Sequence, residues 1–481
     1  MLFVLHCIAS IQFPIDRSID QSTHQERLAL ALLYHSTNGP NWYSSRTHYQ
    51  QGIGIGIGIG IGIDTGTWLS DTHHCNWHGI TCSSMTSSSL PRMAQKREQE
   101  QEQKHQHTTA LTLGWLSNED HMKGYIHPSA IGVFIHLDML YIKDVRGLKG
   151  TLPTEMGNLA NMRIMRVENT GIEGTIPSQL SQMTKLVDVN LHGNNLHGRI
   201  PSELASLTLL NGMDLGNNRL TGIVPLELGV LSGLEYLHLG SNRLGGGGGN
   251  TAVYHGNHGN GSGNEQAQAQ NIMQNVPTFL TNLSYLNLSR NFLSGTIPKD
   301  INRLTKLLAL DLGYNNLVGT IPKQLFNVNV NVKDKDKDKD KDKDEGKYLI
   351  LTLAQLDLSA NQLSGTIPAE FGRMVELTHL QLQDNQFTGT IPSEIGNLNN
   401  LNVLELNGND GLNGGIPEEI CMHVNGNGNG NGNGNLHLMG TSEICKHRDT
   451  PLNCCGDELA NVNLNLVDEE ALLVGGDTNV F

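Results

Sequence analysis

Aromatic residues are scarce in this chain of 481 residues, and basic residues are outnumbered by acidic ones. Phe, Trp and Tyr together make up 5% of the sequence, which is little for one large hydrophobic core. The formal net charge is −15 at pH 7, so nothing would attract a phosphate backbone or an anionic membrane. No run of eighteen or more apolar residues appears, and we therefore expect no transmembrane segment. These absences argue against a nucleic-acid partner and against a membrane-spanning helix within this chain.

Known catalytic motifs are missing as well. The sequence has no G-x-x-x-x-G-K-[ST] phosphate loop, no G-x-S-x-G elbow, no H-E-x-x-H zinc motif and no protein-kinase signature. Asp311 and Asp357 could face a common surface, but an open sheet should leave both carboxylates in water. Paired catalytic carboxylates need a pocket. We therefore expect a protein that is not an enzyme, with no catalytic residues and no cofactor.

The chain does contain one motif that recurs about eleven times between residues 108 and 420. Its clearest copies are "LTKLLALDLGYNNLVGTIP" at 304–322 and "MVELTHLQLQDNQFTGTIP" at 374–392. Both follow the frame L-x-x-L-x-x-L-x-L-x-x-N-x-L-x-G-x-I-P. Within three runs the motif repeats every 24 residues, except for a last step of 25, as shown by Pro153, Pro177, Pro201 and Pro225, by Pro298 and Pro322, and by Pro368, Pro392 and Pro417. Such a period indicates a repeat architecture.

Each copy predicts one turn of a coil. Leu356 and Leu358 alternate around Asp357, so a short strand should direct two leucines inward and one acid outward. A single strand cannot bury those leucines, whereas stacked strands form a continuous core. Asn361 is expected inside the turn, where its amide satisfies backbone groups, and the same role is assigned to Asn194, Asn218, Asn242, Asn291, Asn315, Asn385 and Asn409, with Thr170 as a weaker substitute.

The frame with its x-G-x-I-P ending resembles the plant-type leucine-rich repeats of receptor-like kinase ectodomains, receptor-like proteins and polygalacturonase inhibitors. The resemblance implies an α/β solenoid, a curved right-handed superhelix with short parallel strands on the concave face and disulfide-bonded caps. It also implies a binding module that recognises a protein, peptide or glycan, on the cell surface or after secretion.

Segments that flank the repeats resemble the caps of such proteins. "ERLALALLYHSTNGPNW" at 26–42 has apolar residues at helical spacing, and "TWLSDTHHCNWHGITC" at 67–82 contains the cap motif. The resemblance implies a Cys75–Cys82 disulfide with Trp77 beneath it. Zinc is the alternative for the ligands His73, His74, Cys75, His78 and Cys82, but their spacing fits no standard zinc site, so we expect no metal.

The other cysteines lie at the two ends of the chain. Cys7 falls in the first apolar stretch, and four more follow the last repeat, namely Cys421, Cys445, Cys454 and Cys455. Three pairings are open for these four. An even number of cysteines confined to caps suits an oxidising compartment, so we expect an extracellular or cell-surface protein.

Composition divides the chain into four parts. They are a signal peptide or disordered start at 1–20, an N-terminal cap at 21–107 with low-complexity inserts at 52–63 and 95–107, the repeats at 108–420 with loops at 245–275 and 327–347, and a Cys-containing cap with an acidic tail at 421–481. The "KDKDKD" tract from Lys333 carries alternating charges that cancel locally, so a solvated loop is expected there rather than an ion-binding tail.

The outward positions of the predicted strands are the candidate ligand-binding residues. They are Tyr141, Arg166, Asn190, His192, Asp214, Tyr236, His238, Tyr285, Asn287, Asp311, Asp357, His379, Gln381 and Glu405, flanked by Glu168 and Asp188. Tyr236, His238 and Tyr285 form the most concentrated group, and aromatic residues dominate binding energy at interfaces. Asn260, Asn282 and Asn287 begin N-x-S sequons, of which Asn260 is expected to be the most exposed.

Two other functions remain open from the sequence. One is a surface or cell-wall structural protein without a specific ligand. The other is a fragment of a receptor whose membrane anchor or kinase lies outside this chain.

Overall fold

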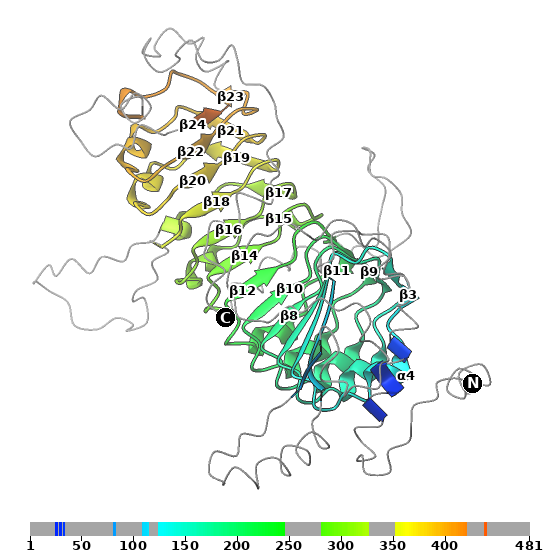
Figure 1. Cartoon of the computed structure of the whole chain (residues 1–481). Coiled ribbons are helices and arrows are strands. Elements are labelled where there is room, and N and C mark those ends of the chain that lie inside the picture. Colours follow the sequence, from blue (N-terminus) through cyan, green and yellow to red (C-terminus); the bar gives the residue numbers. More distant parts are fainter. Residues whose placement is uncertain are drawn as a thin grey trace, which may run out of the picture.

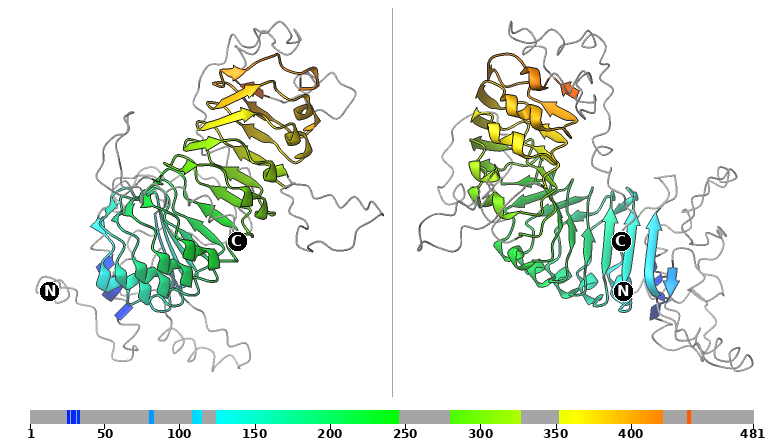
Figure 2. Two further views of the ribbon diagram at one scale, coloured as in Figure 1. Left: turned by 180° about the vertical axis from the view of Figure 1, so that it is seen from behind. Right: turned by 90° about the vertical axis from the view of Figure 1, so that its left-hand side faces the viewer.

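A computed structural model describes residues 25–26, 28–30, 32–33, 80–82, 108–114, 124–245, 280–326, 352–420 and 437–439. These residues form a curved solenoid in which successive repeats stack side by side along one axis (Figure 1). Seen from the side, the strands of consecutive repeats follow one another like the rungs of a ladder (Figure 2). The solenoid predicted from the 24-residue period is therefore confirmed.

A single sheet of thirteen strands runs through the whole solenoid. In spatial order its strands are β1 (Ile80–Cys82), β2 (Thr108–Gly114), β4 (Met139–Lys143), β6 (Ile164–Glu168), β8 (Asp188–Asn190), β10 (Gly212–Asp214), β12 (Tyr236–His238), β14 (Tyr285–Asn287), β16 (Ala309–Asp311), β18 (Gln355–Asp357), β20 (His379–Gln381), β22 (Val403–Glu405) and β24 (His437–Met439). Only the pairing of β1 with β2 is antiparallel, and it contains an irregularity at Thr81 and Cys82. Spatial order follows sequence order, as expected when each repeat contacts only its neighbours.

The two long insertions do not interrupt this sheet. Strand β12 pairs directly with β14 although residues 246–279 separate them, and Leu237 is the partner of Leu286. Strand β16 likewise pairs with β18 across residues 327–351. The return side of the coil absorbs both insertions, as expected from the slow growth of loop-closure entropy with length.

The return side has smaller sheets and short helices. One small sheet contains β7 (Glu173–Gly174), β9 (Asn195–Gly198), β11 (Arg219–Gly222) and β13 (Arg243–Leu244), a second contains β15 (Ser294–Gly295), β17 (Asn316–Gly319), β19 (Gln362–Thr366), β21 (Gln386–Gly389) and β23 (Gly411–Leu412), and a third pairs β3 (Gly124–Tyr125) with β5 (Leu148–Lys149). One four-residue α-helix, α4 (Pro128–Ile131), opens the helical side.

The remaining named helices are 3-10 helices of four or five residues, although the resemblance implied an α/β solenoid. They are η4 (Thr154–Asn158), η5 (Ser178–Gln182), η6 (Ser202–Ser206), η7 (Leu226–Val230), η8 (Lys299–Arg303), η9 (Lys323–Phe326), η10 (Ala369–Arg373) and η11 (Ser393–Asn397). In most of these repeats the motif Pro lies directly before the helix, at φ between −60° and −71°. The return path of a 24-residue repeat is short, and the tight 3-10 geometry suits it.

One continuous hydrophobic core fills the space between the sheet and the helices. Leu356 and Leu358 are each 1% exposed, while Asp357 between them remains partly exposed, as the alternation predicted. The core extends from Leu30 in the N-terminal helical residues to Ile420 after the last described repeat. At the N-terminal end, the backbone N–H of Thr108 donates to Oε2 of buried Glu26 at 2.8 Å, which ties the helical residues to strand β2.

A ladder of buried asparagines connects the turns. The Asn218 Nδ2 donates to the carbonyls of Leu191, Leu215 and Gly216 at 2.9, 3.1 and 3.0 Å, and its Oδ1 accepts from Leu196 N at 3.0 Å. The predicted asparagines repeat this arrangement, and in the first copy Thr170 Oγ1 donates to Asn194 Oδ1 instead. Because each amide satisfies backbone groups of two repeats, the predicted structural role is confirmed.

Several predictions lie outside the described residues. They concern the side chains of Cys75, Cys82, Cys421, Cys445, Cys454 and Cys455, the alternative zinc ligands, Asn260, and the start and end of the chain.

Candidate functional site

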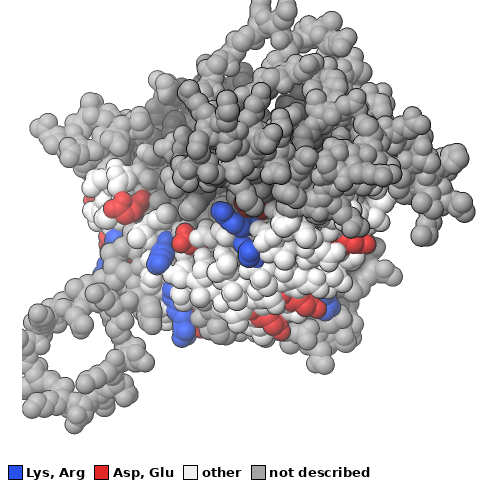
Figure 3. Space-filling view, turned by 60° about the horizontal axis from the view of Figure 1, so that its bottom comes forward, with Lys and Arg blue, Asp and Glu red and all other residues white. Residues whose placement is uncertain are grey.

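The outward residues of the thirteen-stranded sheet form one straight column, called here the central column. It consists of Tyr141, Arg166, Asn190, Asp214, His238, Asn287, Asp311, Asp357, Gln381 and Glu405, each the in-register partner of the next. The sequence prediction that these residues align is confirmed. Figure 3 shows another face of the solenoid, on which acidic and basic residues are scattered among uncharged ones.

At the N-terminal end of the column the charged residues are paired with one another. The Nε of Arg166 lies 2.6 Å from Oδ2 of Asp188, and the Nζ of Lys143 lies 3.4 Å from Oε2 of Glu168. Burial alone would lower the pKa of Arg166, but the hydrogen bond and the charge of Asp188 raise it. Arg166 is therefore committed to an ion pair, and a ligand anion would have to compete with Asp188 for it.

Two tyrosines stack beside the middle of the column. The rings of Tyr236 and Tyr285, which are in-register partners on β12 and β14, lie 4.5 Å apart with an angle of 9° between their planes. His238 meets each ring edge to face, at 6.4 and 6.3 Å. Burial raises the pKa of both tyrosines, that of Tyr285 to about 12, so both phenols are neutral hydrogen-bonding groups at physiological pH. The aromatic concentration predicted at this point is one contiguous cluster.

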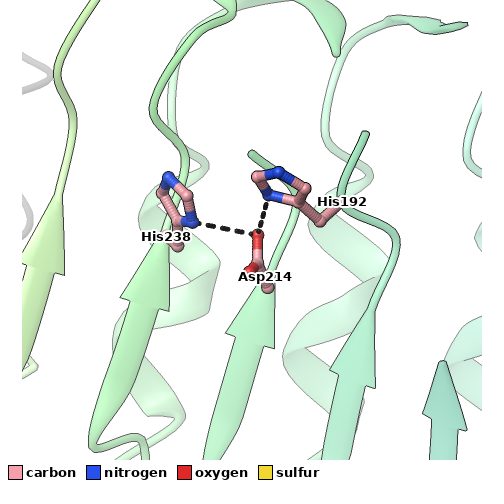
Figure 4. A group of neighbouring side chains, drawn as sticks. All are labelled: His192, Asp214 and His238. Atoms are coloured by element: carbon pink, nitrogen blue, oxygen red, sulfur yellow. Dashed lines mark hydrogen bonds and ion pairs between the residues drawn. The ribbon is translucent and has the colours of Figure 1, made fainter. Parts of the chain in front are cut away.

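The same cluster continues into a triad of His192, Asp214 and His238. Nδ1 of His192 and Nδ1 of His238 lie 3.3 and 3.2 Å from Oδ1 of Asp214 (Figure 4). The two imidazole centroids are 5.3 Å apart. Burial alone would raise the pKa of Asp214, but the hydrogen bonds and charges of the two histidines hold it well below its usual range. Asp214 is therefore a carboxylate that accepts from both rings.

The individual residues of this triad were predicted as site residues, but their association was not. His192 lies two residues beyond the central column, in the position that glycine or serine takes in the next five repeats, as in Gly216 and Gly240. That departure from the repeat is the signal that could have revealed the triad. A long side chain there reaches sideways to the column residue of the next repeat.

The prediction that water reaches Asp311 and Asp357 agrees with the partial exposure of both side chains. Burial, followed by the charge of Asp357, raises the pKa of Asp311 to about 7, although the Gly313 N–H donates to its Oδ1 at 3.0 Å. Asp311 is therefore harder to ionise than a carboxyl group in water.

Asn287, predicted as a ligand-binding residue, needs a correction. It is 3% exposed, and its Oδ1 accepts from the N–H and the hydroxyl of Ser289 at 2.9 and 2.8 Å. Its amide therefore supports the tyrosine cluster and is not available to a ligand or to a glycan. Asn282 is partly exposed, with its Nδ2 donating to the Ser232 carbonyl, and remains a glycosylation candidate.

The other predicted residues extend the face on both sides. Tyr141, Asn190, His379, Gln381 and Glu405 are all partly exposed. Thr378 Oγ1 and the ring Nδ1 of His379 lie 2.9 Å apart, and burial lowers the pKa of His379. The predicted residues thus form a band along the whole sheet, in which the tyrosine cluster and the triad are the densest part.

Comparison with known proteins identifies the repeats. The Leucine Rich Repeat family matches four segments, residues 185–207, 282–304, 352–374 and 376–398. No curated protein matches the sequence.

Solved structures of plant proteins are similar over much of the chain. The plant peptide hormone receptor RGFR1 in complex with RGF2 is 27% identical, with 65% of this chain and 46% of that chain covered and a TM-score of 0.47. The Arabidopsis receptor kinase HAESA ectodomain with an IDA peptide hormone is 21% identical, with 83% and 52% covered and a TM-score of 0.47. A plant ice-binding protein is 23% identical, with 82% and 89% covered and a TM-score of 0.48. The chain spans about half the length of the two receptor structures.

None of the helices within the described residues is long and apolar enough to cross a bilayer. The matched segments, the 24-residue period with its x-G-x-I-P ending and the stacked parallel strands agree with one another. The chain therefore contains leucine-rich repeats, four of which match the Leucine Rich Repeat family, and its described residues have the fold of stacked repeats.

Proposed function

We propose that this protein is a non-enzymatic binding module that recognises an extended peptide along the central column of its concave face. The observation that carries the proposal is the stacked pair Tyr236 and Tyr285, which lies beside the middle of the column and next to the triad. Aromatic side chains in the centre of a contact surface supply much of the binding energy of an interface.

The dimensions of the face suit a peptide. Ten column residues separated by about 4.8 Å span roughly 40 Å, the length of about twelve residues of extended chain. Along that length the column offers uncharged, acidic and imidazole groups in turn. A peptide can meet these with polar and basic side chains, while an apolar side chain contacts the tyrosine pair.

The charge of the face favours a partner with basic groups. Arg166 is held by Asp188, whereas Asp311, Asp357 and Glu405 add acidic character toward the C-terminal end. We place the protein outside the cell or on the cell surface, in agreement with the even number of cysteines that flank the repeats once Cys7 in the first apolar stretch is set aside. A protein partner that presents an extended segment would bind in the same way.

Selection of binders from a displayed library of twelve-residue peptides, with a glycan array in parallel, tests this function. The full chain is immobilised, and the best binder is titrated against the unmodified protein and against Tyr236→Ala and Tyr285→Ala. We expect each substitution to lower the affinity for the peptide at least tenfold. The control is Leu226→Ala on η7, which is 51% exposed on the opposite side and should leave the affinity unchanged.

Two results would contradict the proposal. A selected peptide that is insensitive to both tyrosine substitutions but is lost in Leu226→Ala would place binding on the helical side. Absence of any saturable peptide or glycan would favour a structural protein without a specific ligand.

A further inference from the structure

The triad brings together two imidazoles and one carboxylate from three consecutive repeats. Asp214 and His238 are in-register partners at the ends of β10 and β12, and His192 lies two residues beyond the end of β8. One ligand atom from each of the three side chains lies within 4.8 Å of the other two. Figure 4 shows both rings directed at the same carboxylate oxygen. Among the described residues, this is the one group of three or more His, Cys, Asp or Glu side chains with such a separation.

We propose that His192, Asp214 and His238 bind one divalent transition-metal ion on the concave face. The proposal goes beyond peptide recognition and does not depend on it. Two imidazole nitrogens and one carboxylate oxygen suit Zn²⁺, Cu²⁺, Ni²⁺ or Co²⁺, whereas Ca²⁺ and Mg²⁺ prefer oxygen ligands throughout.

The distances already resemble those of a coordination sphere. With metal–ligand bonds of about 2.1 Å, adjacent ligand atoms of a tetrahedral site lie about 3.4 Å apart. The two nitrogen–oxygen separations in the triad are 3.3 and 3.2 Å. An ion would therefore replace the two imidazole–carboxylate hydrogen bonds with coordinate bonds from the same three side chains, after small side-chain rotations.

The surrounding backbone holds these side chains in place. The Gly216 N–H donates to Oδ1 of Asp214 at 2.9 Å, and the His192 N–H donates to Oδ1 of Asn190 at 2.9 Å. A Cβ atom on Gly216 would lie 2.6 to 2.9 Å from three atoms of the His238 ring. The imidazole of His238 therefore needs a glycine beside it, and the residues that contact the three side chains hold them in position, as in metal sites generally.

Three protein ligands leave at least one coordination position for another group. The triad is only partly buried, and Tyr236 and Tyr285 lie beside it on the same face. A carboxylate or imidazole of a bound partner can occupy the open position. The metal would then bridge the protein and its ligand at the densest part of the face.

The competing explanation is a purely structural hydrogen-bonded triad. It needs no ion, and in that case metals would bind elsewhere or only weakly. Because other histidines and the cysteines of the chain could also bind metals, the test has to assign binding to these three side chains.

Titration of the metal-free full chain with Co²⁺ makes that assignment, with Zn²⁺ added as competitor. We expect visible d–d absorption that saturates at one ion for this site, without the thiolate charge-transfer bands that cysteine ligands would give. We expect each of three substitutions to lower the affinity for this ion at least tenfold, namely His192→Gln, Asp214→Asn and His238→Gln. The control is His379→Gln, which removes an imidazole from the same face outside the triad and should leave the titration unchanged.

Far-ultraviolet circular dichroism establishes that each variant is folded. Folded triad variants that retain the affinity and stoichiometry of the unmodified chain would overturn the proposal. Anomalous diffraction from crystals of the unmodified chain soaked in Zn²⁺ is independent of any substitution. A peak between the three side chains is expected, and occupied zinc elsewhere with none at the triad would also overturn it.

Discussion

Asp311 of β16 and Asp357 of β18 are direct in-register partners, so two carboxylates lie on adjacent strands of the same face. Burial and the negative charge of Asp357 raise the pKa of Asp311 to about 7. The other titratable groups that influence this position are Tyr285 on the preceding strand and His238 one strand further. Repulsion between the two carboxylates therefore destabilises the folded state at neutral pH.

This pair makes stability depend on pH. A carboxyl group whose pKa is higher in the folded state contributes stability that is complete below its unfolded pKa, near 4, and is lost as pH rises through about 7. The free energy of unfolding, measured in urea at pH 5 and pH 7.5, should therefore include a loss from this pair on the order of 2 kcal/mol after screening by water.

Asp357→Asn should remove part of that loss because it removes the like charge, while the larger contribution from burial of Asp311 remains. Its control is Glu203→Gln, which neutralises an exposed acid on η6 and should show the same change with pH as the unmodified chain. Equal losses in Asp357→Asn and the unmodified chain would contradict the role assigned to the pair.

The asparagine ladder predicts a large effect of a small substitution. Asn218→Ala leaves the carbonyls of Leu191 and Leu215 and the Leu196 N–H without their side-chain partner in a buried turn. We expect the free energy of unfolding to fall by about 2 to 4 kcal/mol. Urea denaturation measures it, with exposed Asn399→Ala as the control, where the change should stay within about 0.5 kcal/mol. Equal effects of the two substitutions would show that the turn does not depend on the amide.

Two glycines offer a matched comparison at the triad. Gly216→Ala would force the His238 ring to move, since the added Cβ lies as close as 2.6 Å to it, whereas at Gly233 the nearest atom is the Leu210 carbonyl oxygen at 3.6 Å. We expect Gly216→Ala to change the chemical shifts of the His238 imidazole and to lower the affinity for Co²⁺ at least tenfold. Gly233→Ala should change neither the chemical shifts nor the affinity. Unchanged His238 resonances in Gly216→Ala would show that the ring does not rest on that glycine.

The repeated parts of the fold could be predicted from the sequence because each copy places the same residue types at the same positions of the repeat. The alternation around Asp357 and the buried amide of Asn361 are both found where the motif places them. The structure adds a positive φ at Gly365. At Gly365 a side chain would also press on Thr320, since a Cβ there lies 2.9 Å from its Cγ2. Because the same positions recur in many copies, the structural role of each position did not depend on any single repeat.

The departures from the repeat could not be predicted in the same way. The contact of His192 with Asp214 joins two residues from different positions of neighbouring repeats, so no single motif contains it. The burial of Asn287 depends on how adjacent side chains exclude water, which the sequence pattern does not record. The raised pKa of Asp311 likewise depends on its surroundings in the folded chain. The candidate site is formed largely by these departures.

We propose that the concave strands, rather than the helical side, contact the ligand. Hydrogen–deuterium exchange of the full chain, with and without a saturating peptide from the library selection, distinguishes the two surfaces. We expect slower exchange at residues 188–192, 212–216, 236–240 and 285–289, with no change in η5 to η8. Protection confined to those helices, with unchanged exchange in the strands, would contradict it.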